Sequence, residues 1–243
     1  SKGVARYNSN FSVATSAFTA DAYTSLLLHM DGADDGTTFT DSSWVGNGGA
    51  SRHTITANGD ATNQRPQHHD VTANGDAHLI GPKVGTSAIT FDGSGATADG
   101  YLSIPDSADF NFGTSDFTIE GFMNFNGIFS SHGGGPSVCG QRSSVTSRWS
   151  IYQSRSGLSF YSANGGDDTV DMDSSDLVVN KWYHIAFVRN GNVFTWYIDG
   201  VGDTSYTDSY TLPDVGAAMY VGYNGDTAYG EFDGYISGFR ISD

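Results

Sequence analysis

Carboxylates are the most abundant ionisable side chains in this sequence. Acidic residues number 27 against 11 lysines and arginines, and only two of the acids are glutamates, Glu120 and Glu231. Glycosidases place two carboxyl groups on either side of the bond they cleave. Asp171 and Asp173 stand at positions i and i+2 of a strand-like segment, so their side chains share one face. Alternating aspartates are more typical of a solvated outer face, and we favour that interpretation.

The sequence shows no constellation for nucleophilic catalysis. The single cysteine, Cys139, follows a glycine-rich stretch, and no neighbour is identified that would lower the pKa of its thiol. We therefore expect Cys139 to be a small buried residue at the start of a strand. The sequence contains neither the Gly-x-Ser-x-Gly pattern nor the phosphate-binding Gly-x-x-x-x-Gly-Lys loop.

Aromatic residues interleaved with aspartate and asparagine indicate a possible carbohydrate site. Sugar rings have apolar faces and polar rims, which suit aromatic platforms edged by hydrogen-bonding groups. The predicted carbohydrate-binding residues lie in presumed loops and are Trp44, Tyr206, Tyr210, Tyr223, Asn224, Asp226 and Tyr229. Trp182 and Trp196 lie in strand-like segments and are expected to pack in the core or on a sheet face.

The charge balance excludes two classes of partner. A formal net charge of −16 repels nucleic-acid phosphates and disfavours anionic membrane surfaces. No stretch of 18 apolar residues occurs, so no transmembrane helix and no membrane insertion are expected. The first residues also lack the apolar core of a signal peptide.

The elements that must position these side chains are strands. Short apolar runs alternate with turn clusters from Tyr23 onward, a rhythm typical of a sandwich or barrel. Residues 117–125 alternate cleanly, and residues 182–189 and 193–198 flank Asn190-Gly191, which suits a tight hairpin turn. No window shows a convincing helical period, so helices are expected to be nearly absent.

Two segments depart from this rhythm. Residues 1–23 are small and polar and are expected to form an arm that is disordered or ordered only on a partner. Residues 53–61 (HTITANGDA) nearly recur as 69–77 (HDVTANGDA). We interpret the insertion at 53–77 as a duplicated strand and turn; the alternative is a protrusion that binds a partner.

Several segments, taken in order, resemble a known family. They are 26–32 (LLLHMDG), 38–43 (TFTDSS), 89–93 (ITFDG), 101–110 (YLSIPDSADF), 117–120 (FTIE), 182–189 (WYHIAFVR), 197–200 (YIDG) and 232–241 (FDGYISGFRI). Together they resemble laminin-G-like domains of the concanavalin A-like lectin/glucanase superfamily, in the version common in bacteriophage structural and tail proteins. The resemblance covers residues 24–243 and implies an all-β jelly-roll sandwich of two antiparallel sheets, with the first and last strands adjacent.

The resemblance leaves several functions open, because this fold carries lectins, adhesion modules and glycosidases. The glucanase branch uses a Glu-x-Asp-x-x-Glu arrangement, whereas Glu120 is followed by Phe122 and Asn124. We therefore predict a non-enzymatic recognition module, displayed on a virion surface or otherwise outside the cell, that binds host-surface carbohydrate. The alternative is a capsid or tail decoration protein that contacts neighbouring virion proteins, which allows a homo-oligomer. A glycoside hydrolase or lyase is the least favoured class.

Calcium is the cofactor that the resemblance and the composition suggest. Aspartate-rich loops supply the hard oxygen ligands that Ca²⁺ prefers, and many members of the superfamily hold this ion. The implied fold brings Asp31 and Asp41 near Asp233, which makes these three the predicted metal ligands. Two other candidates are the pair Asp34-Asp35 and the turn at 164–168, and most of these aspartates would otherwise be solvated turn formers.

Overall fold

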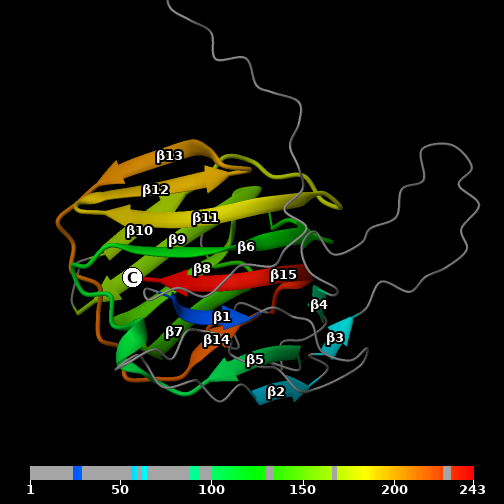
Figure 1. The fold of residues 1–243 in the computed structure, drawn as a ribbon, viewed down its shortest axis with the longest axis horizontal. Helices are drawn as coiled ribbons and strands as arrows, with labels where there is room; N and C mark the ends of the chain where they lie inside the picture. The colour runs from blue at the N-terminus through cyan, green and yellow to red at the C-terminus, as the bar shows by residue number, and fades with distance from the viewer. Residues whose placement is uncertain are drawn as a thin grey trace, which may run out of the picture.

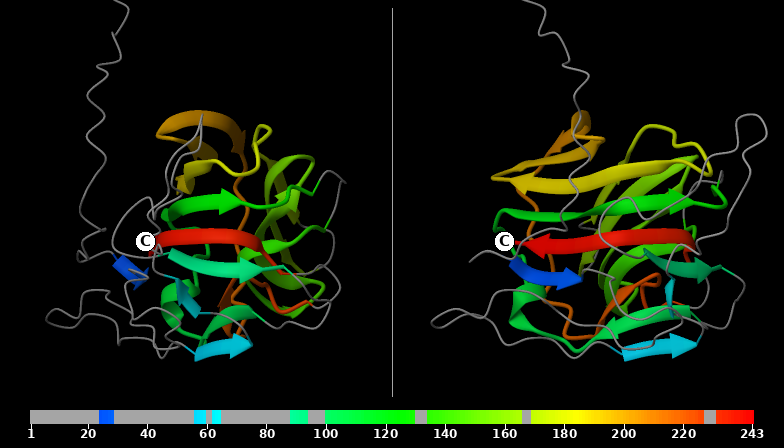
Figure 2. Two further views of the ribbon diagram at one scale, coloured as in Figure 1. Left: turned by 90° about the vertical axis from the view of Figure 1, so that its right-hand side faces the viewer. Right: turned by 45° about the vertical axis from the view of Figure 1, so that its right-hand side comes forward.

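The alternating strands of this sequence form two layers that face each other in the computed structural model (Figures 1 and 2). The predicted arm at 1–23 lies outside the described part of the chain, and so does most of the insertion at 53–77. The structure describes residues 24–28, 56–59, 62–64, 88–93, 100–129, 134–165, 169–226 and 231–243.

The first layer is an eight-stranded sheet whose strands pair antiparallel. Its last strand in sequence, β15 (Asp233–Ser242), pairs along one side with β6 and along the other with both β4 and β1. The remaining strands are β13 (Val201–Thr207), β12 (Val193–Ile198), β11 (Trp182–Asn190), β6 (Phe117–Phe125), β4 (Ala88–Asp92), β3 (Thr62–Gln64) and β1 (Thr24–Leu28).

The second layer is a seven-stranded antiparallel sheet. Its order is β10 (Thr169–Asp173), β9 (Gly157–Asn164), β8 (Ser147–Ser154), β7 (Ser137–Ser144), β14 (Met219–Val221), β5 (Gly100–Ile104) and β2 (Thr56–Gly59). A single 3-10 turn, Ala108–Phe110, is the helical element among the described residues. No helix in these ranges has the length and apolar character needed to span a membrane.

The predicted jelly-roll sandwich is therefore confirmed. Leu26, Leu27 and Leu28 of β1 pair with Ile241, Arg240 and Phe239 of β15, so the first and last described strands are neighbours as the resemblance implied. The Asn190-Gly191 hairpin joins β11 to β12, with Gly191 in the left-handed region at φ +58°. The first copy of the repeated segment contributes β2, which pairs with β5, while the second copy lies outside the described residues.

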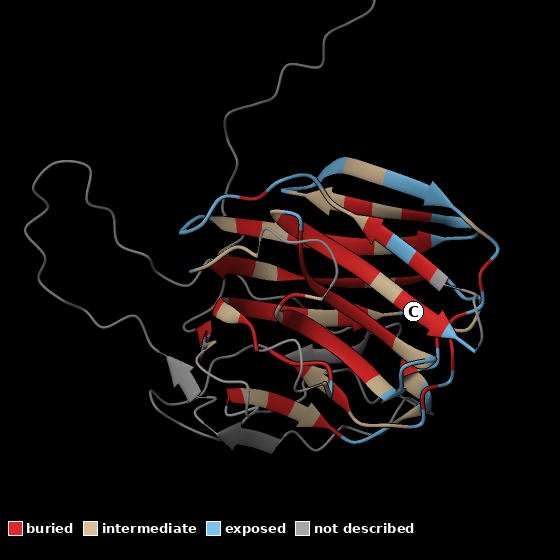
Figure 3. Ribbon diagram, turned by 180° about the vertical axis from the view of Figure 1, so that it is seen from behind, coloured by how far each residue is buried: buried red, intermediate tan, exposed pale blue. Residues whose placement is uncertain are grey.

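Aromatic rings from both sheets form the core between the layers. Phe160 of β9 stacks on Phe187 of β11 with their ring centroids 4.2 Å apart, and Trp196 of β12 lies 4.7 Å from Phe187. These three side chains are fully buried. Figure 3 shows that buried residues run along both sheets, whereas β13 at the edge is largely exposed.

An ion-paired cluster lies on the outer face of the eight-stranded sheet. Glu120 of β6 accepts hydrogen bonds from Arg240 of β15, and its Oε2 lies 3.0 Å from Nε2 of His184 of β11. Burial alone would raise the pKa of Glu120, but the hydrogen bonds with His184 and Arg240 outweigh it and hold this pKa below its ordinary value. The cluster ties the three central strands together.

We expect Phe187→Ala to lower the free energy of unfolding by about 3–5 kcal/mol, because it leaves a cavity between stacked rings. Val201 is 56% exposed on β13. The matched change Val201→Ala should therefore stay within about 0.5 kcal/mol of the wild type. Urea denaturation of both variants measures the difference, and equal losses would contradict the assigned core.

We expect Glu120→Gln to cost about 1–3 kcal/mol of stability at pH 7, since it removes a carboxylate that two cationic side chains contact. The folded-state pKa of Glu120 is lowered, so its contribution is present above the unfolded value of 4.5 and is lost as pH falls through the folded value. The gap between variant and wild type should therefore be smaller at an acidic pH below 4.5 than at pH 7. Denaturation at both pH values tests this, with exposed Asp214→Asn as control; a gap independent of pH would refute it.

Candidate functional site

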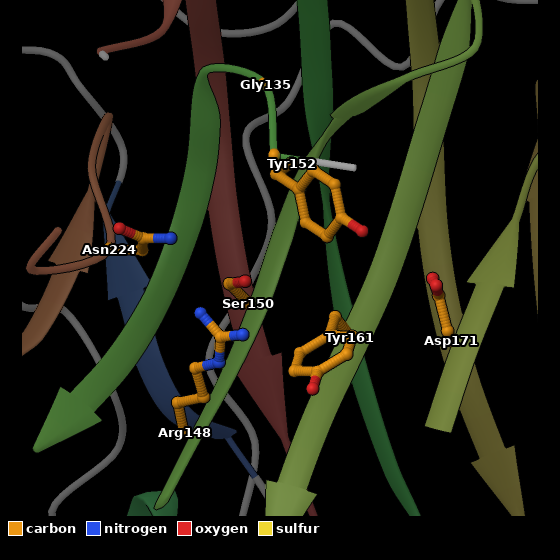
Figure 4. Close-up of a pocket in the computed structure, with 8 residues that line it drawn as sticks. Gly135, Arg148, Ser150, Tyr152, Tyr161, Asp171 and Asn224 are labelled. Atoms are coloured by element: carbon orange, nitrogen blue, oxygen red, sulfur yellow. The ribbon is translucent and has the colours of Figure 1, made fainter. Parts of the chain in front are cut away.

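A hollow of about 220 Å³ lies on the outer face of the seven-stranded sheet (Figure 4). It combines two tyrosines with polar side chains of several kinds, one acidic and one basic. The described residues that line it are Gly134, Gly135, Arg148, Ser150, Tyr152, Tyr161, Asp171 and Asn224.

Strand alternation explains why these side chains gather on one face. In β8, Trp149 and Ile151 point into the core, so Arg148, Ser150 and Tyr152 point outward. The register then places outward residues of neighbouring strands side by side: Tyr161 of β9 lies opposite Ser150 and also opposite Asp171 of β10.

The two tyrosines of the hollow differ in exposure. Tyr152 is 7% exposed, and burial raises the pKa of its phenol to about 12 although a hydrogen bond with Ser159 works against this. Its hydroxyl therefore stays protonated at neutral pH. Tyr161 is half-buried, and the guanidinium of Arg148 lies over its ring, 4.5 Å from the centroid. The hollow thus offers a phenol group and an aromatic ring beside a cation.

Asp171 and Asn224 supply acceptor and donor groups on opposite sides of the hollow. Asp171 is exposed, and its Oδ1 accepts a hydrogen bond from the Ser159 hydroxyl at 3.0 Å. Asn224 is 5% exposed, and its Oδ1 accepts from the backbone N–H of Asp226 at 3.0 Å. That bond orients the Asn224 amide so that its nitrogen points toward the hollow in Figure 4.

Three further tyrosines pack together on the same face beyond β7. Tyr101 of β5, Tyr220 of β14 and Tyr223 have ring centroids 5.0–5.5 Å apart. Burial raises the pKa of Tyr223 to about 12, with a smaller contribution from Asp226. Between this cluster and the hollow lies Gly140, which is opposite Tyr220 on one side and Ser150 on the other. A Cβ at Gly140 would lie 2.6 Å from the carbonyl oxygen of Trp149, so the strands approach too closely for any side chain there.

The predicted carbohydrate-binding residues divide into three groups. Asn224 lines the hollow, Tyr223 belongs to the tyrosine cluster, and Asp226 forms an ion pair with Arg142 at 2.9 Å on the same face. Trp44 and Tyr229 lie outside the described residues.

Tyr206 and Tyr210 lie elsewhere. Tyr206 is part of β13 in the other sheet rather than of a loop; it is 46% exposed, and its hydroxyl donates to Asp208 at 3.2 Å. Tyr210 is 3% exposed and forms a hydrogen bond with Ser162 at 3.2 Å. A buried ring cannot present its face to a sugar, so the structure does not support Tyr210 as a platform.

Sequence reasoning missed most of the hollow. Arg148, Ser150 and Tyr152 were not singled out, although the alternation with Trp149 and Ile151 was a usable signal that they share an outer face. Asp171 was interpreted as part of a solvated outer face, and it is indeed exposed on β10. What the sequence did not contain was the pairing that sets Asp171 beside Tyr161.

Neither glutamate lies at the hollow. Glu120 belongs to the ion-paired cluster on the other sheet, and the buried carboxylate of Glu231 accepts from the backbone N–H of Gly100 at 3.1 and 3.2 Å. Cys139 is fully buried in β7, as predicted, and burial raises the pKa of its thiol. Of the described residues that line the hollow, Asp171 is the one that carries a carboxylate.

The predicted calcium ligands fall only partly within the described residues. Asp233 begins β15 opposite Asp92 of β4, and its Oδ1 accepts from the Asn126 amide at 2.9 Å. Asp31 and Asp41 lie outside the described residues. Within the described ranges no three His, Cys, Asp or Glu side chains come together as a metal site would require. The calcium site therefore stays a prediction.

Two curved antiparallel sheets with a polar and aromatic hollow on one outer face define a lectin-like jelly roll. Residues 92–243 match a laminin-G-like family of the concanavalin A-like lectin/glucanases superfamily, so the chain belongs to that superfamily, as its sequence motifs predicted. No curated protein sequence matches the chain.

Solved structures share the fold at low sequence identity. The binding domain of Paraclostridial Mosquitocidal Protein 1 superposes with a TM-score of 0.62 at 15% identity, covering 90% of this chain and 48% of that one. The binding domain of botulinum neurotoxin serotype G gives 0.60 at 12% identity, covering 90% and 47%. The chain thus spans about half the length of these toxin domains.

A third similar structure is of comparable size to this chain. Domain 4 of AbnA, a GH43 extracellular arabinanase from Geobacillus stearothermophilus, was solved in complex with arabinotriose. It superposes with a TM-score of 0.57 at 19% identity and covers 92% of this chain and 93% of that one.

Proposed function

We propose that this domain binds carbohydrate in the hollow on the outer face of the seven-stranded sheet, without catalysing a reaction. The observation that carries the proposal is the hollow itself, in which the Tyr161 ring lies among a phenol, an amide and a carboxylate. Sugar recognition combines apolar ring contacts with a few fixed polar groups, and this lining has both.

The hydrogen-bonding groups of the hollow suit the hydroxyls of a sugar. The Asn224 amide nitrogen is a donor, and the Tyr152 phenol oxygen, already hydrogen-bonded with Ser159, keeps capacity to accept. Asp171 uses Oδ1 to accept from Ser159, which leaves Oδ2 as an acceptor for a ligand hydroxyl. The sheet already orients these hydrogen-bonding groups. Ligand binding therefore immobilises few further side chains and loses little conformational entropy.

The single carboxylate in the described lining of the hollow supports binding rather than cleavage. Hydrolysis needs an acid and a base or nucleophile on both sides of the scissile bond. Among the described residues that line the hollow, Asp171 is the one with a carboxylate. Its i+2 neighbour Asp173 is directed to Arg155, with 3.6 Å between Oδ2 and Nε. That an arabinanase domain of this fold was solved with arabinotriose supports the same role here.

The proposal extends to where the domain acts. We place it on the outside of a virion, where it would capture host-surface glycans. The support for this setting is the resemblance of its opening, central and closing segments to domains of bacteriophage structural and tail proteins.

Tyr161→Ala should weaken binding of the best glycan from a glycan array at least tenfold, which corresponds to about 1.4 kcal/mol. Asp171→Asn should also weaken it, because a ligand hydroxyl loses its charged acceptor. Tyr206→Ala is the matched control, since it removes an exposed tyrosine from β13 in the other sheet. Isothermal titration of each variant supplies the affinities.

Two results would contradict the proposal. An array on which no glycan binds the wild-type domain would refute carbohydrate recognition. Loss of binding in Tyr206→Ala with full binding in Tyr161→Ala would place the site on the other sheet.

A chelator gives a separate prediction. Because the described lining contains a single carboxylate, glycan affinity should be unchanged in EDTA. Titrations in EDTA and in CaCl₂ measure this. If binding disappears in EDTA and returns with calcium, an ion takes part in the site and the metal-free hollow proposed here is wrong.

A further inference from the structure

Two arginines face each other at one end of the hollow. Arg142 of β7 and Arg148 of β8 are direct partners in the register of the two antiparallel strands. Like charges in directly opposite positions destabilise a sheet. Positive side chains are also scarce in this sequence, which has 11 lysines and arginines and a net charge of −16.

Only one of the two guanidinium groups has a carboxylate partner. Arg142 forms an ion pair with Asp226 at 2.9 Å. Arg148 has no carboxylate partner among the described residues; its guanidinium instead lies over the ring of Tyr161. This end of the hollow therefore carries two positive charges and one negative charge.

Both arginines also hold buried nitrogens that lack a partner. Nη1 of Arg142 and Nε of Arg148 are removed from solvent and form no hydrogen bond within the described part of the chain. A buried charged donor without an acceptor is unfavourable. An anionic group seated against the part of the Arg148 guanidinium that lines the hollow would balance the uncompensated positive charge.

The two ends of the hollow differ in charge. Asp171 on β10 lies on the far side of Tyr161 from β8, across the pairs Ser150–Tyr161 and Tyr161–Asp171. Figure 4 shows Arg148 and Asp171 on separate sides of Tyr161. A ligand with an anionic substituent at one end and hydroxyls at the other matches this arrangement.

We propose that the hollow selects an anionic sugar and that Arg148 binds its negative group. This rests on the proposed carbohydrate-binding function. The planar guanidinium fits a carboxylate or a sulfate with two parallel hydrogen bonds, and the neighbouring Arg142 adds to the local positive potential. Asp171, on the far side of Tyr161 from Arg148, then binds the uncharged part of the sugar.

The test uses three matched ligand pairs that differ in charge. They are sialyllactose with lactose, trigalacturonate with its methyl ester, and sulfated with unsulfated galactose disaccharide. We expect the acidic member of at least one pair to bind the wild-type domain at least tenfold more tightly than its neutral counterpart. Which pair shows the preference distinguishes a carboxylate from a sulfate.

Arg148→Gln should reduce that preference to about twofold or less, because the anion loses its partner. Arg155→Gln is the matched control: it removes the same charge from a side chain that is 56% exposed, and it should keep the preference. Arg148→Lys keeps the charge but loses the planar fork, so it should lose at least threefold of the preference even if the glutamine variant folds poorly. Circular dichroism reports folding for each variant.

The outcomes separate this inference from the function on which it rests. If neutral and acidic members bind equally and Tyr161→Ala abolishes both, the carbohydrate site stands and the anion selectivity is wrong. Equal loss of the preference in Arg148→Gln and Arg155→Gln would also overturn it, because general electrostatics would then explain the result. If no sugar binds, both proposals fail.

Discussion

The stack of Phe160 on Phe187 is the contact on which the arrangement of both faces depends. It joins β9 of one sheet to β11 of the other, with the two rings 4.2 Å apart and fully buried. Because side chains alternate along a strand, burying Phe160 forces Tyr161 to the outer face. A slip of one residue would bury the tyrosine and expose the phenylalanine. The same reasoning applies in β8, where Trp149 and Ile151 fix Arg148, Ser150 and Tyr152 outward.

The two outer faces use their polar residues differently. On the eight-stranded sheet, Glu120 contacts both Arg240 and His184, so its carboxylate is satisfied within the protein. On the seven-stranded sheet, Arg148 has an aromatic partner but no carboxylate, and Asp171 keeps one oxygen uncommitted, as far as the described residues extend. A satisfied cluster stabilises the fold, whereas uncommitted polar groups on a rigid sheet are available to a ligand. The hollow is what favours the seven-stranded sheet, because Asn124 and Trp182 on the other sheet also hold buried polar atoms without a partner among the described residues.

Much of the fold was predictable because it depends on local patterns. The clean alternation at 117–125 corresponds to β6, and the Asn190-Gly191 turn lies between the paired strands β11 and β12. The site was less predictable because it depends on pairing between strands distant in sequence. Tyr223, Asn224 and Asp226 lie on the face that carries the hollow. Arg142 and Arg148 become neighbours only through the β7–β8 register, which shifts at two places. Tyr210 failed as a platform because its hydroxyl finds Ser162 inside the protein, a contact that no single-sequence pattern reveals.

Gly140 has a consequence for the length of ligand that the face can hold. It leaves a lane without a side chain between the hollow and the cluster of Tyr101, Tyr220 and Tyr223. Neighbouring strands lie about 4.8 Å apart, so Tyr220 of β14 and Ser150 of β8 are two strand spacings apart across Gly140. An oligosaccharide that spans the lane would contact aromatic rings at both ends, so longer chains gain contacts that a single sugar cannot make.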